Sequence, residues 1–307
     1  MKNLNYGIIG NCTSAALVSW DGSIDWCCLP AFDSASVFAR LLDKDIGGEF
    51  RMDVSPDYTT FQQYLQRTNV LVTTFSNGPD QFELIDFMPR YRNSSGQLHC
   101  PPEIIRYIRH ISGTPVLRVL FNPRPSYGKY SVKTELETEF IKKRSSTRFH
   151  ESVYLYSDLD LSLIENKQEI PITADHYLLL SYHQKLTDMS LDSIHLKLEK
   201  TKVYWLDWSS QSNRFSQYNE EILRSALVLK LLTFQKTGAI IAAVTTSLPE
   251  ELGGTRNWDY RYCWLRDAGM IIAVMTKLNH YKEARRFLDF ILGIIPYNSH
   301  FAYLNYN

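Results

Sequence analysis

The chain has no excess of charge of either sign. Its 307 residues contain 33 Lys and Arg and 33 Asp and Glu, so the formal net charge at pH 7 is zero. A nucleic acid or an anionic membrane attracts a strongly basic surface, and this balance excludes such a global field. We therefore expect neither a nucleic-acid nor a membrane partner.

Long apolar runs are also missing. Residues 1–20 contain no uninterrupted apolar stretch ahead of a small-residue cleavage site, so no secretory signal is expected. The longest apolar segments, residues 226–232 and 238–244, are broken up by Lys230 and Lys236. Such interrupted segments do not indicate a membrane span, and we expect a cytoplasmic protein.

Cysteine is scarce and irregularly spaced. The five cysteines are odd in number, and adjacent Cys27 and Cys28 lack the spacing of a zinc site or of a redox CxxC motif. The eight histidines show no paired spacing with carboxylates. We expect reduced, mostly buried thiols, no metal site and no cofactor.

Up to about residue 200 the signals are strands and turns. Residues 68–76 and 81–87 flank an Asn-Gly turn and predict a hairpin. Residues 104–111 and 116–121 flank a Ser-Gly-Thr turn and predict a second hairpin. Many short strands with little helix are typical of a β-sandwich.

Helical patterns follow the β-rich half. Residues 203–208 predict a short linker helix, and Asn219 is the expected cap of a second helix that stops at Gly238. A third, residues 267–278, has almost no polar face and is expected to be buried on all sides. A fourth, residues 281–292, is amphipathic.

The most informative stretch is residues 253–269, GGTRNWDYRYCWLRDAG, which contains two Trp, two Tyr, three Arg and two Asp. Flat aromatic faces beside charged hydrogen-bonding groups suit a sugar, and the glycines indicate an exposed loop. The structural alternative is an aromatic core strand with snorkelling arginines. For Asp267 the alternative is a helix cap paired with Arg266.

Two segments of the chain resemble one family. Residues 245–269, TTSLPEELGGTRNWDYRYCWLRDAG, look like the hallmark of glycoside hydrolase family 15, the glucoamylases, glucodextranases and bacterial trehalases. Residues 6–43, YGIIGNCTSAALVSWDGSIDWCCLPAFDSASVFARLLD, are similar to the opening of the bacterial members. The resemblance implies a super-β-sandwich, a linker and an (α/α)6 barrel. It also implies inverting hydrolysis of α-glucosidic bonds in α-glucan oligosaccharides or trehalose.

The resemblance further implies roles for residues of the motif. Arg266 and Asp267 match the pair that holds the hydroxyls of the terminal glucose, and Trp264 matches the tryptophan that lines this subsite. Tyr260 matches the tyrosine near the reacting carbon. An arginine–aspartate pair suits hydroxyls, because the carboxylate accepts hydrogen bonds while the guanidinium donates them. Supporting roles behind these residues fall to Trp258 and Arg261.

The catalytic acids are not expected within the chain. An inverting glycosidase needs a general acid and a general base roughly 6.5–9.5 Å apart. The resemblance places both glutamates beyond residue 307. A twelve-helix barrel needs on the order of 200 residues, whereas 90 follow Gln217, enough for three helices.

Local acids are poor substitutes. Candidates by composition are Glu250, Glu251, Asp259 and Asp267. The resemblance assigns Asp267 to sugar hydroxyls, and active members carry the counterpart of Asp259 without using it as acid or base. We therefore expect a chain that is inactive by itself.

These observations predict a β-sandwich over residues 1–200, a linker helix over 201–217 and the first helices of an incomplete (α/α)6 barrel over 218–307. The leading hypothesis is a truncated family 15 glycosidase. The uncovered apolar surface of an incomplete barrel predicts self-association or pairing with a separately encoded C-terminal half.

Three alternatives remain open. The chain is a non-catalytic carbohydrate-binding or interaction module, one half of a split enzyme, or a β-sandwich structural protein without a ligand. Full burial of Trp264 or Arg266 against the core would favour the structural protein.

Overall fold

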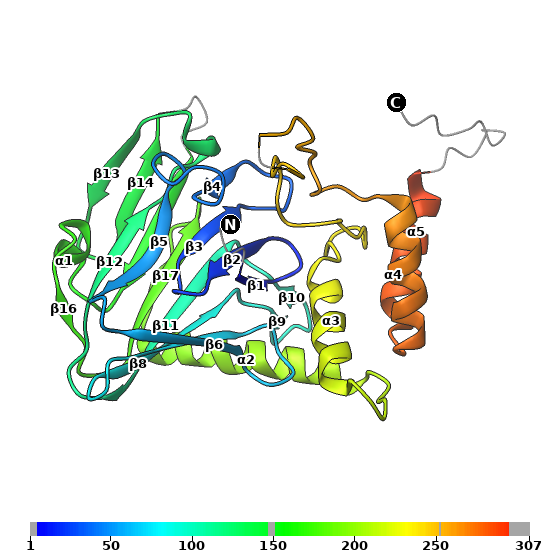
Figure 1. Cartoon of the computed structure of the whole chain (residues 1–307), viewed down its shortest axis with the longest axis horizontal. Helices are drawn as coiled ribbons and strands as arrows, with labels where there is room; N and C mark the ends of the chain where they lie inside the picture. Colours follow the sequence, from blue (N-terminus) through cyan, green and yellow to red (C-terminus); the bar gives the residue numbers. More distant parts are fainter. Residues whose placement is uncertain (1–4, 147–150, 252, 295–307) are drawn as a thin grey trace.

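The computed structural model of the chain describes residues 5–146, 151–251 and 253–294. Strands fill the first part of the chain and helices the last (Figure 1). The strands are β1 (Tyr6–Gly10), β2 (Ala15–Ser19), β3 (Ile24–Cys28), β4 (Ser36–Phe38), β5 (Glu49–Val54), β6 (Thr59–Tyr64), β7 (Leu71–Ser76), β8 (Gln81–Phe87), β9 (Tyr91–Arg92), β10 (Leu98–His99), β11 (Glu103–Ser112), β12 (Val116–Asn122), β13 (Val132–Leu136), β14 (Ile141–Ser145), β15 (Ser152–Ser157), β16 (Ile170–Pro171) and β17 (His176–Tyr182). The helices are the 3-10 turn η1 (Ser126–Gly128), α1 (Leu161–Glu165), α2 (Leu191–Ser210), α3 (Asn219–Leu231), α4 (Leu265–Lys277) and α5 (Tyr281–Ile294).

Two large antiparallel sheets form most of the β-rich part, as expected for a sandwich, and within the described residues β9 and β10 pair as a separate two-stranded hairpin. Within the described ranges the first has the order β1-β2-β3-β5-β12-β16, with β4 paired to β3, and the second has the order β13-β14-β15-β17-β11-β8-β7-β6. Buried side chains from both sheets share one core, among them Phe50 and Val119 from the first and Phe82 and Ile104 from the second. Burial of these inward-facing residues is the main force that holds the sheets together.

One predicted hairpin is confirmed and the other is wrong. β7 and β8 pair directly around the Asn77-Gly78 turn. β11 pairs with β8 and β17, whereas β12 pairs with β5 and β16 in the other sheet. The turn at Gly113, whose φ is +70°, therefore carries the chain from one sheet to the other. Its sequence pattern indicated two strands and a turn, but only long-range packing decides which strand each one pairs with.

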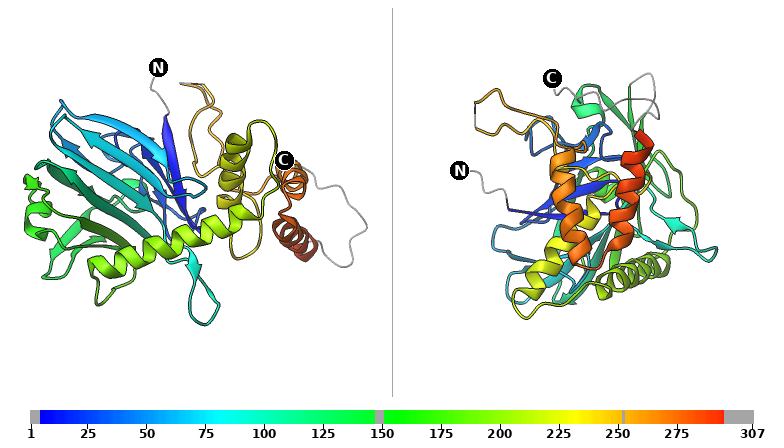
Figure 2. Two further views of the ribbon diagram at one scale, coloured as in Figure 1. Left: turned by 90° about the horizontal axis from the view of Figure 1, so that it is seen from below. Right: turned by 90° about the vertical axis from the view of Figure 1, so that its right-hand side faces the viewer.

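The linker helix is longer than expected. α2 begins at Leu191, where Ser190 and Ser193 form a reciprocal capping box. It lies along the outer face of the second sheet (Figure 2), where Ile194 and Leu198 pack against Phe87. Apolar residues are sparse in the N-terminal half of α2. This explains why only the aromatic C-terminal half of the helix was predicted.

The helix that starts at Asn219 is present, but its predicted ends are wrong. The residue in the cap position is Tyr218, in a left-handed conformation, and the Asn219 side chain instead accepts a hydrogen bond from the backbone N–H of Phe215 at 3.1 Å. α3 ends at Leu231 rather than near Gly238. The chain turns there because Leu231 packs on the outer face of the first sheet.

α4 and α5 stand side by side at one end of the molecule (Figure 1, Figure 2). The prediction that the third helix is buried on all sides is wrong: in α4 only Ala268 and Met275 are buried, whereas Met270 is 59% and Val274 44% exposed. Neighbouring helices cover one side of α4 and leave the other uncovered. The amphipathic helix predicted from Tyr281 is confirmed as α5.

The sequence predicts mostly buried, reduced cysteines and no membrane span. Cys12, Cys27 and Cys28 are buried free thiols. None of the helices within the described ranges combines the length and the apolar character of a membrane span.

Candidate functional site

The motif, residues 253–269, is a loop up to Trp264 and then the first turn of α4, and it forms no strand, so the core-strand alternative is wrong. Its backbone runs beside residues 240–247. The N–H of Ala243 donates to the carbonyl of Tyr260 at 2.8 Å, and the N–H of Ser247 donates to that of Trp258 at 3.3 Å. This short pairing fixes the path of the loop before it enters α4.

Arg261 attaches the motif loop to the β-sandwich. Its side chain is 6% exposed; Nε and Nη2 lie 2.9 and 2.8 Å from the two carboxylate oxygens of Asp259. Nη1 donates to the carbonyl of Ser34 at 2.6 Å. Although burial disfavours its charge, hydrogen bonding to Asp259 raises the pKa of Arg261. The family resemblance implies a supporting role for Arg261, and a guanidinium paired with a carboxylate on one side and a carbonyl on the other is suited to position the loop.

Asp259 is correspondingly held as a carboxylate. Burial raises the pKa of its carboxyl group, but the hydrogen bonds and charge of Arg261 outweigh burial, so the net shift is downward. A carboxylate in this state is a poor proton donor at neutral pH. Both of its oxygens are also occupied by the guanidinium, which leaves little capacity to activate a water molecule.

Arg266 and Asp267 lie in the first turn of α4 and contact each other. Nη2 of Arg266 is 3.5 Å from Oδ2 of Asp267, with the side chains 74% and 40% exposed. The capping alternative for Asp267 is wrong, because Trp264 occupies the cap position and no side chain caps the helix. Asp267 still lies where the helix dipole favours a negative charge.

Trp264 and Tyr260 form an aromatic pair beside Arg266. Their ring centroids lie 6.4 Å apart with an interplanar angle of 29°, and both residues are half-buried. Neither Trp264 nor Arg266 is fully buried, so the observation that would favour a purely structural protein is not met. The sixth residue of the predicted set, Trp258, is 55% exposed.

The exposed groups of the motif can form hydrogen bonds to a ligand. A partly exposed carboxylate and guanidinium offer acceptors and donors for hydroxyls, next to aromatic faces. Within the described ranges, no group of three or more His, Cys, Asp or Glu side chains is placed to hold a metal ion.

A buried polar cluster that the sequence did not signal joins α2, α3 and α5. Oε1 of Glu283 accepts hydrogen bonds from Nζ of Lys230 at 2.7 Å and from the indole of Trp208 at 3.0 Å. The ring of His280 stacks on Trp208 with centroids 3.8 Å apart. Nothing in the spacing of these residues signals the cluster, because three different helical segments contribute to it.

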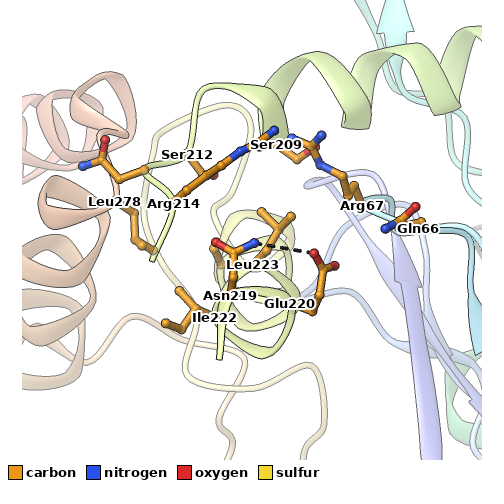
Figure 3. Close-up of a pocket in the computed structure, with 12 residues that line it drawn as sticks. Gln66, Arg67, Ser209, Ser212, Arg214, Asn219, Glu220, Ile222, Leu223 and Leu278 are labelled. Atoms are coloured by element: carbon orange, nitrogen blue, oxygen red, sulfur yellow. Dashed lines mark hydrogen bonds between the residues drawn. The ribbon is translucent and has the colours of Figure 1, made fainter. Parts of the chain in front are cut away.

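Among the cavities formed by the described residues, two lie beside the helices. One, of about 190 Å³, lies between the end of α2 and the start of α3, where Arg67, Arg214 and Asn219 line it (Figure 3). The other, of about 720 Å³, lies between the β9–β10 hairpin, α2 and α5. Neither is lined by residues 258–267, so neither cavity belongs to the motif.

Two family models match the chain. The model described as "Trehalase-like, N-terminal" matches residues 5–156, and the model described as "Glycosyl hydrolases family 15" matches residues 216–301.

Proteins named trehalase are similar to nearly the whole chain. That of Thermoplasma volcanium is 35% identical over 94% of this chain and 47% of the relative, and that of Thermoplasma acidophilum is 33% identical over 91% and 48%. Trehalase 2 of Sulfolobus acidocaldarius is 31% identical over 96% and 50%. The chain thus spans about half the length of the curated relatives it matches.

Proposed function

Because the chain belongs to glycosyl hydrolases family 15 and carries the trehalase-like N-terminal segment of that family, we propose that the mouth of α4 binds one glucose unit of trehalose. The observation that carries the proposal is the Arg266–Asp267 pair, exposed at the start of α4 beside the Tyr260–Trp264 pair. In this arrangement Asp267 accepts hydrogen bonds from sugar hydroxyls, Arg266 donates to them, and the rings cover the apolar face of the sugar.

Trehalose is preferred over an α-glucan oligosaccharide as the ligand. The similar curated proteins are named trehalases, and their similarity extends over more than nine tenths of this chain. A ligand without charge also agrees with the site, because the opposite charges of Arg266 and Asp267 balance. A glucoamylase-type preference for α-glucan ends is the alternative within the family.

We further propose that residues 1–307 alone bind the sugar without hydrolysing it. Inverting hydrolysis needs a proton donor and a separate base. Asp259 is committed to Arg261, and Asp267 is committed to sugar hydroxyls under the proposal. Under this proposal the chain consists of a sandwich (1–200), a linker (201–217) and the first barrel helices (218–307). A further polypeptide segment then supplies the remaining barrel helices, and with them the general acid and the general base.

The second candidate function is a carbohydrate-binding or interaction module that never turns over. The exposed apolar residues of α4 and α5 favour it, since they offer a surface for a protein partner rather than for a sugar.

The deciding experiment measures glucose release and sugar binding with the purified 307-residue chain. Trehalose and maltooligosaccharides are the ligands, and Asp267→Ala and Trp264→Phe are the variants. We expect no glucose release, but quenching of tryptophan fluorescence by trehalose that is lost in Asp267→Ala. Release that disappears in Asp267→Ala would overturn the inactivity and assign the chemistry to acids in this chain. Absence of both release and binding would favour the interaction module.

A further inference from the structure

The larger cavity, which we call the hairpin cavity, lies between the β9–β10 hairpin, the C-terminal half of α2 and the first turn of α5. Its volume of about 720 Å³ falls within the range of about 300–1,000 Å³ that is typical of small-molecule sites. It shares no residue with the motif loop 253–269, so it is a separate feature from the proposed trehalose site.

Positive charge prevails on its walls. Three acidic side chains line the cavity, and two of them are already paired: Glu283 with Lys230 at 2.7 Å and Glu199 with Lys202 at 2.8 Å. Six cationic side chains line it, namely Arg90, Arg92, Lys200, Lys230, Lys282 and Arg286, and only Lys230 of these six is the partner of one of the three acids. A cavity walled in this way concentrates anions.

Arg90 is the unusual member of this set. It is 1% exposed, and none of the described residues offers it a carboxylate partner. Its Nη atoms donate to neutral groups, the carbonyl of Asn11 and the side-chain oxygen of Gln235, while its Nε is buried without any hydrogen-bond partner. A buried charge is costly unless it is paired, so an anion at this wall would supply the missing compensation.

Flat aromatic surfaces line the same cavity. The guanidinium of Arg90 lies 4.7 Å from the ring centroid of Tyr204, and Tyr91 and Trp208 are further wall residues. The polar side chains of Asp207 and Gln211 add acceptors for hydroxyl groups. This combination suits a ligand that has both a hydroxylated ring and an anionic group.

We propose that the hairpin cavity binds a small organic anion of sugar size, with the cationic side chains recognising its anionic group and the aromatic walls contacting its ring. A phosphate ester and a carboxylate share this chemistry. The binding surface and the ligand both differ from those of the trehalose proposal. Binding of an anionic sugar can therefore be measured independently of trehalose binding and of glucose release.

The test is isothermal titration of the 307-residue chain with four probes: glucose 6-phosphate, glucuronate, glucose and inorganic phosphate. We expect at least one of the two anionic sugars to bind, and to bind more tightly than both glucose and inorganic phosphate; which one binds distinguishes the ester from the carboxylate. If glucose binds as tightly as the anionic sugars, the claim that the cavity recognises an anionic group is overturned. If inorganic phosphate binds as tightly, the claim that the aromatic walls contact a ring is overturned. If neither anionic sugar binds, the whole proposal is overturned.

The location is tested with Lys200→Glu/Lys282→Glu. Both lysines are exposed and have no carboxylate partner within the described ranges, so the variant should fold. We expect binding to weaken by about tenfold or more, which corresponds to about 1.4 kcal/mol, because the variant removes two cationic side chains from the cavity wall. The matched control, Lys44→Glu/Lys129→Glu, changes the net charge equally at exposed positions outside the cavity. Equal weakening in both variants, or in neither, would reject the cavity as the site.

Discussion

Lys230 on α3 and Glu283 on α5 form a buried ion pair, with Nζ and Oε1 2.7 Å apart and the side chains 5% and 10% exposed. Because Trp208 on α2 donates to the same oxygen, one carboxylate links three helices. The burial of Trp208, Leu227 and Met275 in one apolar cluster surrounds this polar centre. This buried ion pair therefore helps to hold α2, α3 and α5 together.

The first prediction concerns this carboxylate. Glu283→Gln leaves the Lys230 ammonium buried without a counter-charge, so we expect the free energy of unfolding to fall by about 3–5 kcal/mol. Urea unfolding measures the change. The control is Glu169→Gln, which breaks an exposed pair with Arg118 and should cost about 0–1 kcal/mol. Equal small losses in both variants would show that the buried pair does not hold the helices.

The second prediction is a loss of stability at mildly acidic pH. Burial lowers the pKa of His280, which stacks on Trp208 and contacts the Ser212 hydroxyl at 2.7 Å, and Lys230 lowers it further despite Glu283. The unfolded chain therefore takes up the proton first, and stability is lost as pH falls through the unfolded value of about 6.5. Melting temperatures at pH 7.5 and 5.5 should differ less in His280→Phe than in the parent chain. His195→Asn, at an exposed position on α2, should leave the difference unchanged.

How much of the fold and of the candidate site the sequence predicts depends on how far apart along the chain the interacting residues lie. The β7–β8 hairpin followed from an Asn-Gly turn between two alternating segments, because all its determinants are local. The placement of β11 and β12 in different sheets could not be predicted, because each strand pairs with strands that are not its neighbour in the sequence. The contact of Arg266 with Asp267 was expected from adjacency, whereas the Lys230–Glu283 pair joins residues 53 positions apart and leaves no sequence signal.

The third prediction tests the anchoring of the motif loop. Arg261→Ala removes the hydrogen bond to Ser34 that attaches the loop to the sandwich, together with those to Asp259 inside the loop, and should lower the free energy of unfolding by about 2–3 kcal/mol. The loop should then open more often, so we expect trypsin to cleave faster after exposed Arg256. Arg261→Lys cannot reproduce the paired contacts and should not restore protection. Unchanged cleavage in Arg261→Ala would mean that backbone pairing alone holds the loop.

The fourth prediction separates sugar contact from stability. Arg266 is exposed, Asp267 is partly exposed, and the two charged groups are 3.5 Å apart, so Arg266→Gln and Asp267→Asn should each change the free energy of unfolding by no more than about 1 kcal/mol. Under the proposed function both variants should nevertheless lose trehalose binding, measured by quenching of tryptophan fluorescence. Retained binding in both would exclude the pair from the sugar site, whatever their stability.

The fifth prediction concerns the uncovered face of α4. Met270 and Val274 lie one helical turn apart and are 59% and 44% exposed, so together they form an apolar strip on α4. Since burying such side chains stabilises association, we expect the chain to self-associate with rising concentration. Met270→Glu/Val274→Glu should shift it toward the monomer in size-exclusion chromatography with light scattering, without loss of melting temperature.

The matched control is Leu196→Glu/Leu206→Glu, which places the same charges at exposed apolar positions of α2. If only the α4 variant becomes monomeric, the contact between copies lies on α4, where further barrel helices would pack under the proposed function. If both variants become monomeric, added negative charge alone accounts for the effect. A parent chain that stays monomeric at every concentration would mean that this strip is too small to drive association of two copies by itself.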